Sequence, residues 1–500
     1  MNGKPDPAAH IRLRAGRDAR MRPPNVAPGG WATLQPRQSI DPRPGTITAA
    51  YAMAQQPFRT NCAPAMKSRR SRPATPSHQR GQALILTALL VIVGFGALLF
   101  NSTALVSNSI ANQQAKNAEI ELAKVRDALI GWSASRTPPL GGANARPGDL
   151  PCPDMNNDGF EDGSCVAGAI GRMPWKTLNI PEPKDSSAET LWYAIAGPFR
   201  NYNMNTASIN SDTVGNLTLY VGSSATTLTS QAIAVIFSPG ASLGAQNRDP
   251  STNALCATTG TTIARNLCAA NYLEATGGGN NAQTGGPFIQ AQSSGTFNDR
   301  PLVITNADLM PVVEPRVARE LRTILQNYKA NTACACTNLG GTAGCYPWAD
   351  LSNGTSDAPP YDIGQGNNRG RVPALGASPY NWGANPCGSA VPTLPSWFVD
   401  NDWRLVVYYS AGRNFLGPGA CTTCADPTLT VTGDAVPMKE VVILMPGPLL
   451  GAPPRAPVPL DDSTYWQYYF EDAANRDFAN DFYIIPTSTA YTRDRIFAIP

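Results

Sequence analysis

The chain is poor in histidine. Only two histidines, His10 and His78, occur in 500 residues, and both lie within the first 81. Residues 82–500 therefore contain no imidazole that could act as the base of a Ser-His-Asp or Cys-His system, or as a zinc ligand. The sequence therefore excludes these chemistries from the rest of the chain, and it leaves two-carboxylate hydrolysis and oxygen-ligated metals open.

The chain is also poor in charge. Charged residues make up 15% of the sequence and hydrophobic residues 42%, which is too apolar for a disordered chain and low in charge for a cytosolic enzyme. Residues 1–81 carry 14 Lys or Arg against 3 Asp, whereas residues 82–500 carry 25 against 33 Asp or Glu. A basic front and a mildly acidic body argue against nucleic-acid binding. The length, with 44 Gly and 46 Pro, predicts two or more folded units rich in loops and β-structure.

A long uncharged stretch follows the basic front. No charged residue occurs between Gln82 and Ala115, and residues 83–100 (ALILTALLVIVGFGALLF) are almost wholly apolar. Because about 20 helical residues cross the hydrocarbon core of a bilayer, this run predicts a membrane-spanning helix with its basic side in the cytoplasm. The helical pattern continues until it breaks at Pro138. We therefore expect one helix over 82–135.

The segment before this helix is short and basic and ends in Gly81. A basic leader ending in glycine, an apolar helix of this length and a globular region after it resemble type IV minor pilins and type II secretion pseudopilins. The resemblance implies a leader over 66–81 that prepilin peptidase cleaves between Gly81 and Gln82. It also implies that residues 1–65 are a disordered extension or a misassigned start. The family usually carries Glu at the fifth mature position, whereas this chain has Leu86, and tip-located minor pseudopilins also lack that Glu.

The rest of the chain contains the same landmarks twice in the same order, which indicates a tandem duplication. The paired segments are 123–136 with 318–331, 171–178 with 344–351, 191–201 with 403–415, 234–245 with 441–452, and 298–305 with 492–500. We expect a first globular head over 136–310 and a second over 311–500.

Each head is expected to pack one helix on a small antiparallel sheet. Short β-branched or aromatic runs bounded by Gly or Pro predict the strands. These runs are Tyr193–Ile195, Ile233–Phe237, Leu302–Thr305, Leu405–Tyr409 and Val441–Leu444. The fold class predicted is α+β, with a long N-terminal membrane-spanning helix followed by two tandem pilin-like heads.

The cysteines predict disulfides. Ten of the 11 follow Cys62, and an even number outside a reducing compartment favours disulfide pairing. Cys152 and Cys165 bracket one loop, and Cys256 and Cys268 bracket another. In the second head the pairing stays open among Cys334, Cys336, Cys345, Cys387, Cys421 and Cys424. The alternative for Cys421 and Cys424 is a redox or zinc site, but neither a second C-x-x-C motif nor a histidine accompanies them.

A candidate calcium site lies inside the first cysteine loop. Asp154, Asn156 and Asp158 occupy positions 1, 3 and 5 of a calcium-loop pattern, and Asp162 occupies position 9. The twelfth position is Cys165 rather than the Glu that closes such sites. The alternative is a turn rich in Asp and Asn, whose carboxylates stay solvated.

The function expected from these features is structural. The resemblance implies a non-enzymatic pilin-like or pseudopilin-like subunit at or near a filament tip, for assembly initiation or surface contact. Two heads on one helix are too bulky for the tight spacing of a pilus shaft. The partners implied are other pilin or pseudopilin subunits, prepilin peptidase and the inner-membrane assembly platform, with no nucleic acid. The location implied is a single pass through the inner membrane with periplasmic heads, followed by the filament tip or cell surface.

Two alternatives belong to other classes. One is a membrane-anchored periplasmic binding or scaffold protein. The other is a secreted hydrolase that uses two carboxylates. Asp299 and Asp494 correspond between the two heads, but each precedes an Arg, and we expect both to form ion pairs at a strand edge.

Overall fold

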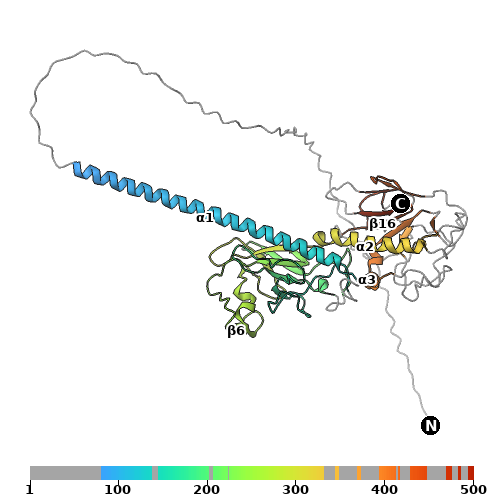
Figure 1. Ribbon diagram of the computed structural model, residues 1–500, viewed down its shortest axis with the longest axis horizontal. Helices are drawn as coiled ribbons and strands as arrows, with labels where there is room; N and C mark the ends of the chain where they lie inside the picture. Colours follow the sequence, from blue (N-terminus) through green and yellow to red (C-terminus); the bar gives the residue numbers. More distant parts are fainter. Residues whose placement is uncertain are drawn as a thin grey trace, which may run out of the picture. The chain divides into compact units, whose positions relative to one another are not determined.

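The computed structural model places most of the chain from residue 80 onward (Figure 1). The residues it describes are 80–137, 145–201, 207–222, 224–330, 344–347, 349, 369–372, 394–412, 415–416, 428–447, 469–475, 482–485 and 494–500. The chain divides into two compact units, Met1–Ala83 and Leu84–Pro500, and all of the strands below lie in the second. Most of the expected leader, the extension over 1–65 and Cys62, Cys334, Cys336, Cys387, Cys421 and Cys424 fall outside the described residues.

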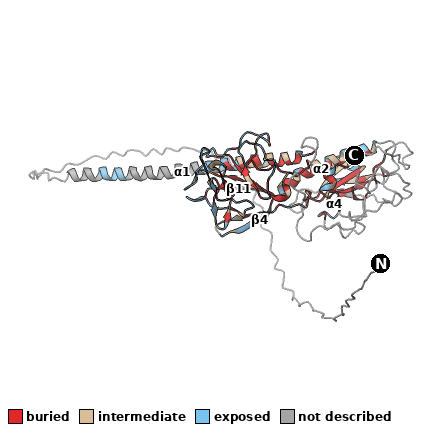
Figure 2. Ribbon diagram, turned by 90° about the horizontal axis from the view of Figure 1, so that it is seen from below, coloured by how far each residue is buried: buried red, intermediate tan, exposed pale blue. Residues whose placement is uncertain are grey.

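Helix α1 runs from Arg80 to Ser135. In its last turns Leu122, Val125 and Leu129 recur at the helical spacing and are buried in the core, which fixes this end of the helix. Its residues 89–93 are exposed (Figure 2).

No described helix combines the length and apolar character needed to cross a membrane. From Asn112 onward the helix carries polar and charged side chains and packs its apolar ones on protein. The predicted membrane-spanning helix over 82–135 and the predicted single-pass inner-membrane location are therefore wrong.

The first four-stranded sheet has the order β1-β2-β5-β11, with antiparallel neighbours throughout. Its strands are β1 (Ile170–Arg172), β2 (Trp192–Ile195), β5 (Ala234–Ser238) and β11 (Arg300–Ile304). Every residue of β2 and β5 is buried. Both strands are therefore almost continuously apolar, as is usual for strands covered on both faces.

A three-stranded sheet and two hairpins complete this part of the chain. The sheet has the order β10-β3-β4, in which β10 and β3 are parallel. The strands are β3 (Leu217–Val221), β4 (Thr226–Ala232), β10 (Phe288–Gln290), and the hairpins β6 (Asn253–Cys256) with β7 (Thr261–Ala264) and β8 (Ala275–Thr276) with β9 (Gly279–Asn280). Short 3₁₀ turns among the described residues are η1 (Gly197–Phe199), η3 (Arg265–Leu267) and η4 (Ala269–Asn271). We call β1–β11 the first sheet group.

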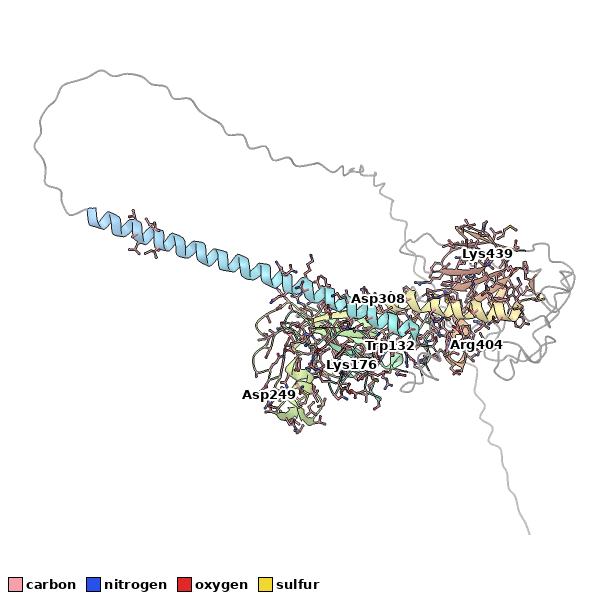
Figure 3. The ribbon with its side chains drawn as sticks, viewed as in Figure 1. Trp132, Lys176, Asp249, Asp308, Arg404 and Lys439 are labelled. Atoms are coloured by element: carbon pink, nitrogen blue, oxygen red, sulfur yellow. A yellow bond between two sulfur atoms is a disulfide. The ribbon has the colours of Figure 1, made fainter. Side chains whose placement is uncertain are left out.

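Helix α2 (Asn306–Lys329) follows β11. Its start is held by a capping box, in which Thr305 N donates a 2.8 Å hydrogen bond to Asp308 Oδ2. Asp308 lies in the first turn of the helix (Figure 3). A stripe of apolar residues at helical spacing buries one face of the helix against strands of the second half of the chain.

The second half repeats the sheet order of the first. Its four-stranded sheet runs β12-β13-β16-β18, again with antiparallel neighbours, and its three-stranded sheet runs β15-β14-β17. The elements are β12 (Arg369–Arg371), α3 (Ser396–Asp400), α4 (Trp403–Val406), β13 (Tyr408–Ala411), β14 (Leu429–Thr432), β15 (Met438–Lys439), β16 (Val441–Met445), β17 (Phe482–Ile484) and β18 (Arg495–Ile499). We call β12–β18 the second sheet group.

The register of the two four-stranded sheets is also the same. Arg300 lies opposite Ser238, and Arg495 lies opposite Met445, at the same place before the Pro-Gly that follows β5 and β16. At the other edge, Arg172 lies opposite Trp192 and Arg371 lies opposite Tyr408.

This register corrects one of the sequence matches. The counterpart of Gly171-Arg172 is Gly370-Arg371 in β12, and not the segment 344–351 that the sequence paired with 171–178. Within that segment, Tyr346 forms a parallel bridge with Leu416, as Leu150 does with Arg200.

The described chain thus consists mostly of small sheets with few helices. One large buried cluster joins α1, the first four-stranded sheet, α2 and part of the second sheet. A smaller cluster lies on the second sheet group, where the Tyr408 ring contacts the rings of Tyr469 and Phe470 edge-on. The predicted fold class, with its membrane-spanning helix, is corrected accordingly.

Candidate functional site

The expected cleavage point lies near the start of α1. Gly81 and Gln82 both belong to the helix, which begins at Arg80 and continues through Leu86. The side chains of these three positions are not among those the structure describes. Cleavage between Gly81 and Gln82 therefore stays a prediction.

A short part of α1 exposes apolar side chains on every side. Five consecutive residues, Leu89–Val93, are each 53–70% exposed. Because successive helical residues are 100° apart, five in a row cover the whole circumference of the helix. The last turns of α1 have one apolar face, and that face is buried. A contiguous exposed apolar surface of this kind indicates a site of interaction with another molecule.

The four residues of the candidate calcium site lie together in one loop. Asp154 Oδ1 accepts hydrogen bonds from Asn157 N at 2.6 Å and Asp158 N at 3.2 Å, and its Oδ2 accepts one from Gly159 N at 2.7 Å. Burial raises the pKa of the Asp154 carboxyl above its ordinary value, and these three N–H groups act in the opposite direction. Asp154 therefore acts as an organiser of the backbone.

The other three candidate ligands also accept backbone N–H groups. Asn156 Oδ1 accepts from Asp158 N, Asp158 Oδ1 accepts from Phe160 N, and Asp162 Oδ2 accepts from Met155 N. This is the arrangement of a turn rich in Asp and Asn, the alternative that the sequence left open. Among the residues that the structure describes, no group of three or more Asp, Glu, His or Cys side chains is placed to hold a metal ion.

Two disulfides close loops in the first sheet group. One joins Cys152 to Cys165 around the Asp154 loop, and the other joins Cys256, the last residue of β6, to Cys268, which follows the β6–β7 hairpin. These are the two loops that the cysteine spacing brackets. Cys345, in the second half of the chain, is also disulfide-bonded.

The buried carboxylates Asp299 and Asp494 do not form the ion pairs expected with the arginines that follow them. Asp299 Oδ2 accepts hydrogen bonds from Glu274 N at 2.7 Å and Asn281 Nδ2 at 2.9 Å. Burial, followed by the neighbouring Glu274 carboxylate, raises the pKa of Asp299 well above its usual range. Asp494 Oδ2 accepts from Asn475 Nδ2 at 3.0 Å, so the two aspartates hold equivalent turns together.

The ion pair that does form was not anticipated from the sequence. Glu314 of α2 lies 2.9 Å through Oε2 from Arg495 Nε of β18, and the Glu314 side chain is fully buried. Its Oε1 accepts a 2.7 Å hydrogen bond from Ser211 Oγ, which belongs to the first sheet group. The sequence does contain a signal for this pair. Both residues are repeated at the spacing of the helix match, because Glu119 and Arg300 occur 195 residues before Glu314 and Arg495.

Ser211 belongs to a segment, residues 207–213, that connects the two sheet groups. Ile209 N donates to Asn401 Oδ1 at 2.9 Å, and Asn210 Nδ2 donates to the Asn401 carbonyl oxygen at 3.0 Å. At its other side, Asn306 Nδ2 donates to the Ser211 carbonyl oxygen at 3.0 Å. The segment therefore contacts both the α3–α4 region and the start of α2.

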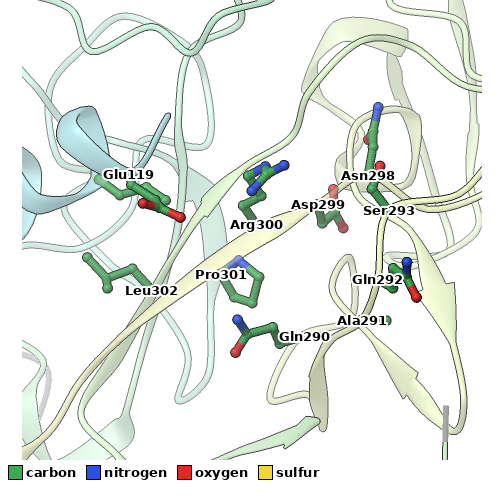
Figure 4. Close-up of a pocket in the computed structure, with 11 residues that line it drawn as sticks. Glu119, Gln290, Ala291, Gln292, Ser293, Asn298, Asp299, Arg300, Pro301 and Leu302 are labelled. Carbon is green, nitrogen blue, oxygen red and sulfur yellow. The ribbon is translucent and has the colours of Figure 1, made fainter. Parts of the chain in front are cut away.

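A pocket of about 410 Å³ lies at the counterpart of the Glu314–Arg495 pair. Glu119 from α1 and Arg300 from β11 both line it (Figure 4). The remaining lining residues are Leu122, Gln290–Ser293, Asn298, Asp299, Pro301 and Leu302. The pocket thus lies between the end of α1 and the edge strand of the first four-stranded sheet.

The comparisons with known proteins identify no relative. No protein-family model matches the chain, no curated protein matches it, and no solved structure matches its fold.

Proposed function

We propose that this chain is a non-enzymatic structural subunit of a filament, positioned at or near the tip, of the kind formed by type IV minor pilins and type II secretion pseudopilins. The proposal takes its family from the basic leader ending in Gly81 and the long helix that follows. The observation that carries it is the exposure of Leu89–Val93 around the whole of α1.

The exposed apolar segment needs partners on all sides. Full burial of a Val, Leu or Ile side chain contributes about 1.5–3 kcal/mol, and five such residues lie in a row. One partner surface covers one face of a helix, whereas helices of several neighbouring subunits cover all of them. A filament in which subunits stack through such helices satisfies this requirement.

The polar groups described above favour a structural role. The carboxyl groups of Asp154, Asp299 and Asp494 accept hydrogen bonds from backbone N–H groups or asparagine amides. Carboxyl groups that accept such hydrogen bonds fix the turns in which they lie, which is a structural task.

The test introduces a charge into the exposed segment. Val91→Asp places a carboxylate where apolar neighbours would surround it, and burying an unpaired charge costs several kcal/mol. Asn117→Asp adds the same charge at an exposed polar position of α1. We expect V91D to disappear from filaments sheared from cells while N117D remains, with equal thermal stability for the two purified variants. V91D at wild-type level in the sheared fraction would contradict the proposal.

Processing is tested separately. Sequencing of the protein recovered from sheared filaments is expected to give Gln82 as the first residue, because the resemblance implies cleavage after Gly81. A chain that retains residues before Gln82 in the filament fraction would remove prepilin peptidase from the list of proposed partners.

A further inference from the structure

The repeat places one pair of charged residues in two different environments. Glu119 and Arg300 lie 195 residues before Glu314 and Arg495, respectively. Strand register supports the equivalence, because Arg300 and Arg495 occupy the same position of the edge strands β11 and β18. In the second sheet group, Glu314 is fully buried and its Oε2 lies 2.9 Å from Arg495 Nε. The two charges there neutralise each other directly.

In the first sheet group the equivalent two charges stay apart. Among the residues that the structure describes, the side chains of Glu119 and Arg300 form no ion pair with each other, and neither forms a hydrogen bond or an ion pair with another group. Glu119 is exposed and Arg300 is partly exposed. Both line the pocket of about 410 Å³ (Figure 4). A carboxylate and a guanidinium are therefore both available to a ligand in this pocket.

The other polar groups of the lining leave this charge pattern unchanged. The carboxyl of Asp299 is held by Glu274 N and Asn281 Nδ2, and the raised pKa of Asp299 favours its neutral form. The remaining polar residues of the lining are uncharged, namely Gln290, Gln292, Ser293 and Asn298. The pocket thus offers a ligand one negative side chain, one positive side chain and neutral hydrogen-bonding groups.

The lining also has an aliphatic part, and the pocket has the size of a small-molecule site. The aliphatic residues are Leu122 of α1, Pro301 and Leu302 of β11, and Ala291. A volume of about 410 Å³ falls within the range of roughly 300–1,000 Å³ that is usual for ligand pockets, and it is many times the share of one water molecule, about 30 Å³. Apolar walls with a few polar groups are typical of such sites.

We propose that this pocket binds a small zwitterion with an aliphatic body, such as a free aliphatic amino acid, whose ammonium pairs with Glu119 and whose carboxylate pairs with Arg300. Such a ligand completes between Glu119 and Arg300 the neutralisation that Glu314 and Arg495 make directly. The planar guanidinium fork suits a carboxylate, which it binds through two parallel hydrogen bonds. A neutral polyol leaves both charges unpaired. A simple anion or cation pairs with one of the two side chains and is repelled by the other.

This site goes beyond the filament role proposed above, because it does not involve Leu89–Val93. The two proposals are tested separately. V91D is expected to bind the ligand as the wild type does, and a variant that loses the ligand is expected to remain in filaments.

Isothermal titration calorimetry of the full-length chain with L-leucine tests the site. We expect saturable binding to the wild type and about tenfold weaker binding to Glu119→Gln and Arg300→Gln, since each variant loses one charge-assisted interaction. Asp127→Asn on α1 and Arg319→Gln on α2 remove exposed charges outside the pocket and should bind as the wild type does. Absence of saturable binding at millimolar L-leucine, or unchanged binding by either E119Q or R300Q, would overturn the proposal.

Analogues of leucine test each charge of the ligand. Leucinamide keeps the ammonium and lacks the carboxylate, whereas 4-methylpentanoate keeps the carboxylate and lacks the ammonium. We expect each to bind about tenfold more weakly than L-leucine. R300Q should leave the affinity for leucinamide unchanged, and E119Q should not weaken the binding of 4-methylpentanoate. Binding of glucose as tight as that of L-leucine, or an equal effect of R300Q on leucinamide and L-leucine, would show that the pocket does not recognise a zwitterion.

A variant that fills the pocket guards against an effect of E119Q or R300Q on folding. Gln292 is an exposed residue of the lining whose side chain makes no hydrogen bond among those described, so Gln292→Trp adds an indole without removing a contact. We expect Q292W to lose L-leucine binding at an unchanged thermal midpoint. Asn253→Trp, at an exposed position of the β6–β7 hairpin, should bind normally. Wild-type binding by Q292W would place the ligand elsewhere and reject the proposal.

Discussion

Arg146 and Asn401 lie 255 residues apart in the sequence, and Arg146 Nη1 donates a 2.6 Å hydrogen bond to Asn401 Oδ1. The same guanidinium pairs through Nε with Asp149 Oδ1 at 2.7 Å, and both of these side chains are buried. Asn401 Oδ1 also accepts from Ile209 N. The neutral Asn401 amide oxygen thus accepts two hydrogen bonds, one from the arginine of the buried ion pair and one from the backbone of the connecting segment 207–213.

Asn401→Ala is expected to lower the free energy of unfolding by about 2–4 kcal/mol. The substitution leaves a buried arginine N–H and the Ile209 N–H without their acceptor, and an unsatisfied buried donor costs about 1–3 kcal/mol, more when charged. Urea denaturation measures the change. Asn253→Ala, at an exposed position of β6, serves as the control and is expected to change stability by less than about 0.5 kcal/mol. Equal losses of stability in the two variants would show that the hydrogen bonds to the Asn401 side chain do not stabilise the fold.

Glu314→Ala and Glu119→Ala compare the same residue in the two repeats. Removing one partner of a buried ion pair costs about 3–5 kcal/mol, and Arg495 is 25% exposed, so we expect about 3 kcal/mol for Glu314→Ala. Glu119 is exposed, and its removal is expected to change stability by less than about 0.5 kcal/mol. Urea denaturation of the two purified variants checks both values. A loss of stability for E119A as large as that for E314A would contradict the difference in burial between the two glutamates.

The raised pKa of Asp299 predicts a stability that falls as the pH rises. The folded state holds the Asp299 proton above the pKa of about 3.9 at which the unfolded chain releases it. Within that window the folded state binds more protons, so the free energy of unfolding declines with pH by up to about 1.4 kcal/mol per pH unit. The decline ends when the pH passes the folded-state pKa.

Asp299→Asn is expected to remove this decline, because the amide retains an oxygen for Glu274 N and Asn281 Nδ2 without a titrating proton. Thermal unfolding between pH 4 and pH 8 measures the difference from wild type, which should grow with pH in favour of the variant. Asp127→Asn on the exposed face of α1 is the control and should keep the wild-type slope. A slope that D299N leaves unchanged would assign the pH dependence to another group.

Asp154→Ala is expected to loosen the loop inside the Cys152–Cys165 disulfide. It removes the acceptor of three backbone N–H groups and should cost about 2–3 kcal/mol in local stability. Asp158→Ala, at an exposed position whose side chain accepts only Phe160 N among the described hydrogen bonds, should cost less than about 1 kcal/mol. Hydrogen exchange of residues 154–162 measures both changes, and equal exchange rates would contradict the central role of Asp154.

Strands and loops whose determinants are local could be predicted closely. The apolar runs of β5 (Ala234–Ser238) and β16 (Val441–Met445) each precede a Pro-Gly and lie within a residue of the predicted bounds. The strand predicted over Leu405–Tyr409 begins instead at Tyr408. Residues 403–406 form the short helix α4, whose aromatic and apolar residues are equally suited to a strand by composition.

Features that depend on distant segments were predicted incorrectly. The Pro-Trp strings of 171–178 and 344–351 look alike, but hydrogen-bond register, which the local sequence does not contain, equates 171–172 with 370–371. The arginines after Asp299 and Asp494 were expected to pair with those aspartates. A carboxylate at the start of an edge strand faces the neighbouring turn, where asparagine and backbone donors are nearer.

By itself the sequence determined the elements whose signals lie within a few residues: short β-branched strands, the helix face of α2 and the two cysteine loops. Tertiary structure alone decided that Glu314 is buried and Glu119 is exposed, although the repeat gives both the same position. Ser211, whose hydroxyl donates a hydrogen bond to the Glu314 carboxylate, is 103 residues from Glu314 along the chain. The burial of a carboxylate depends on which distant segment folds over it, and that depends on the packing of the whole chain.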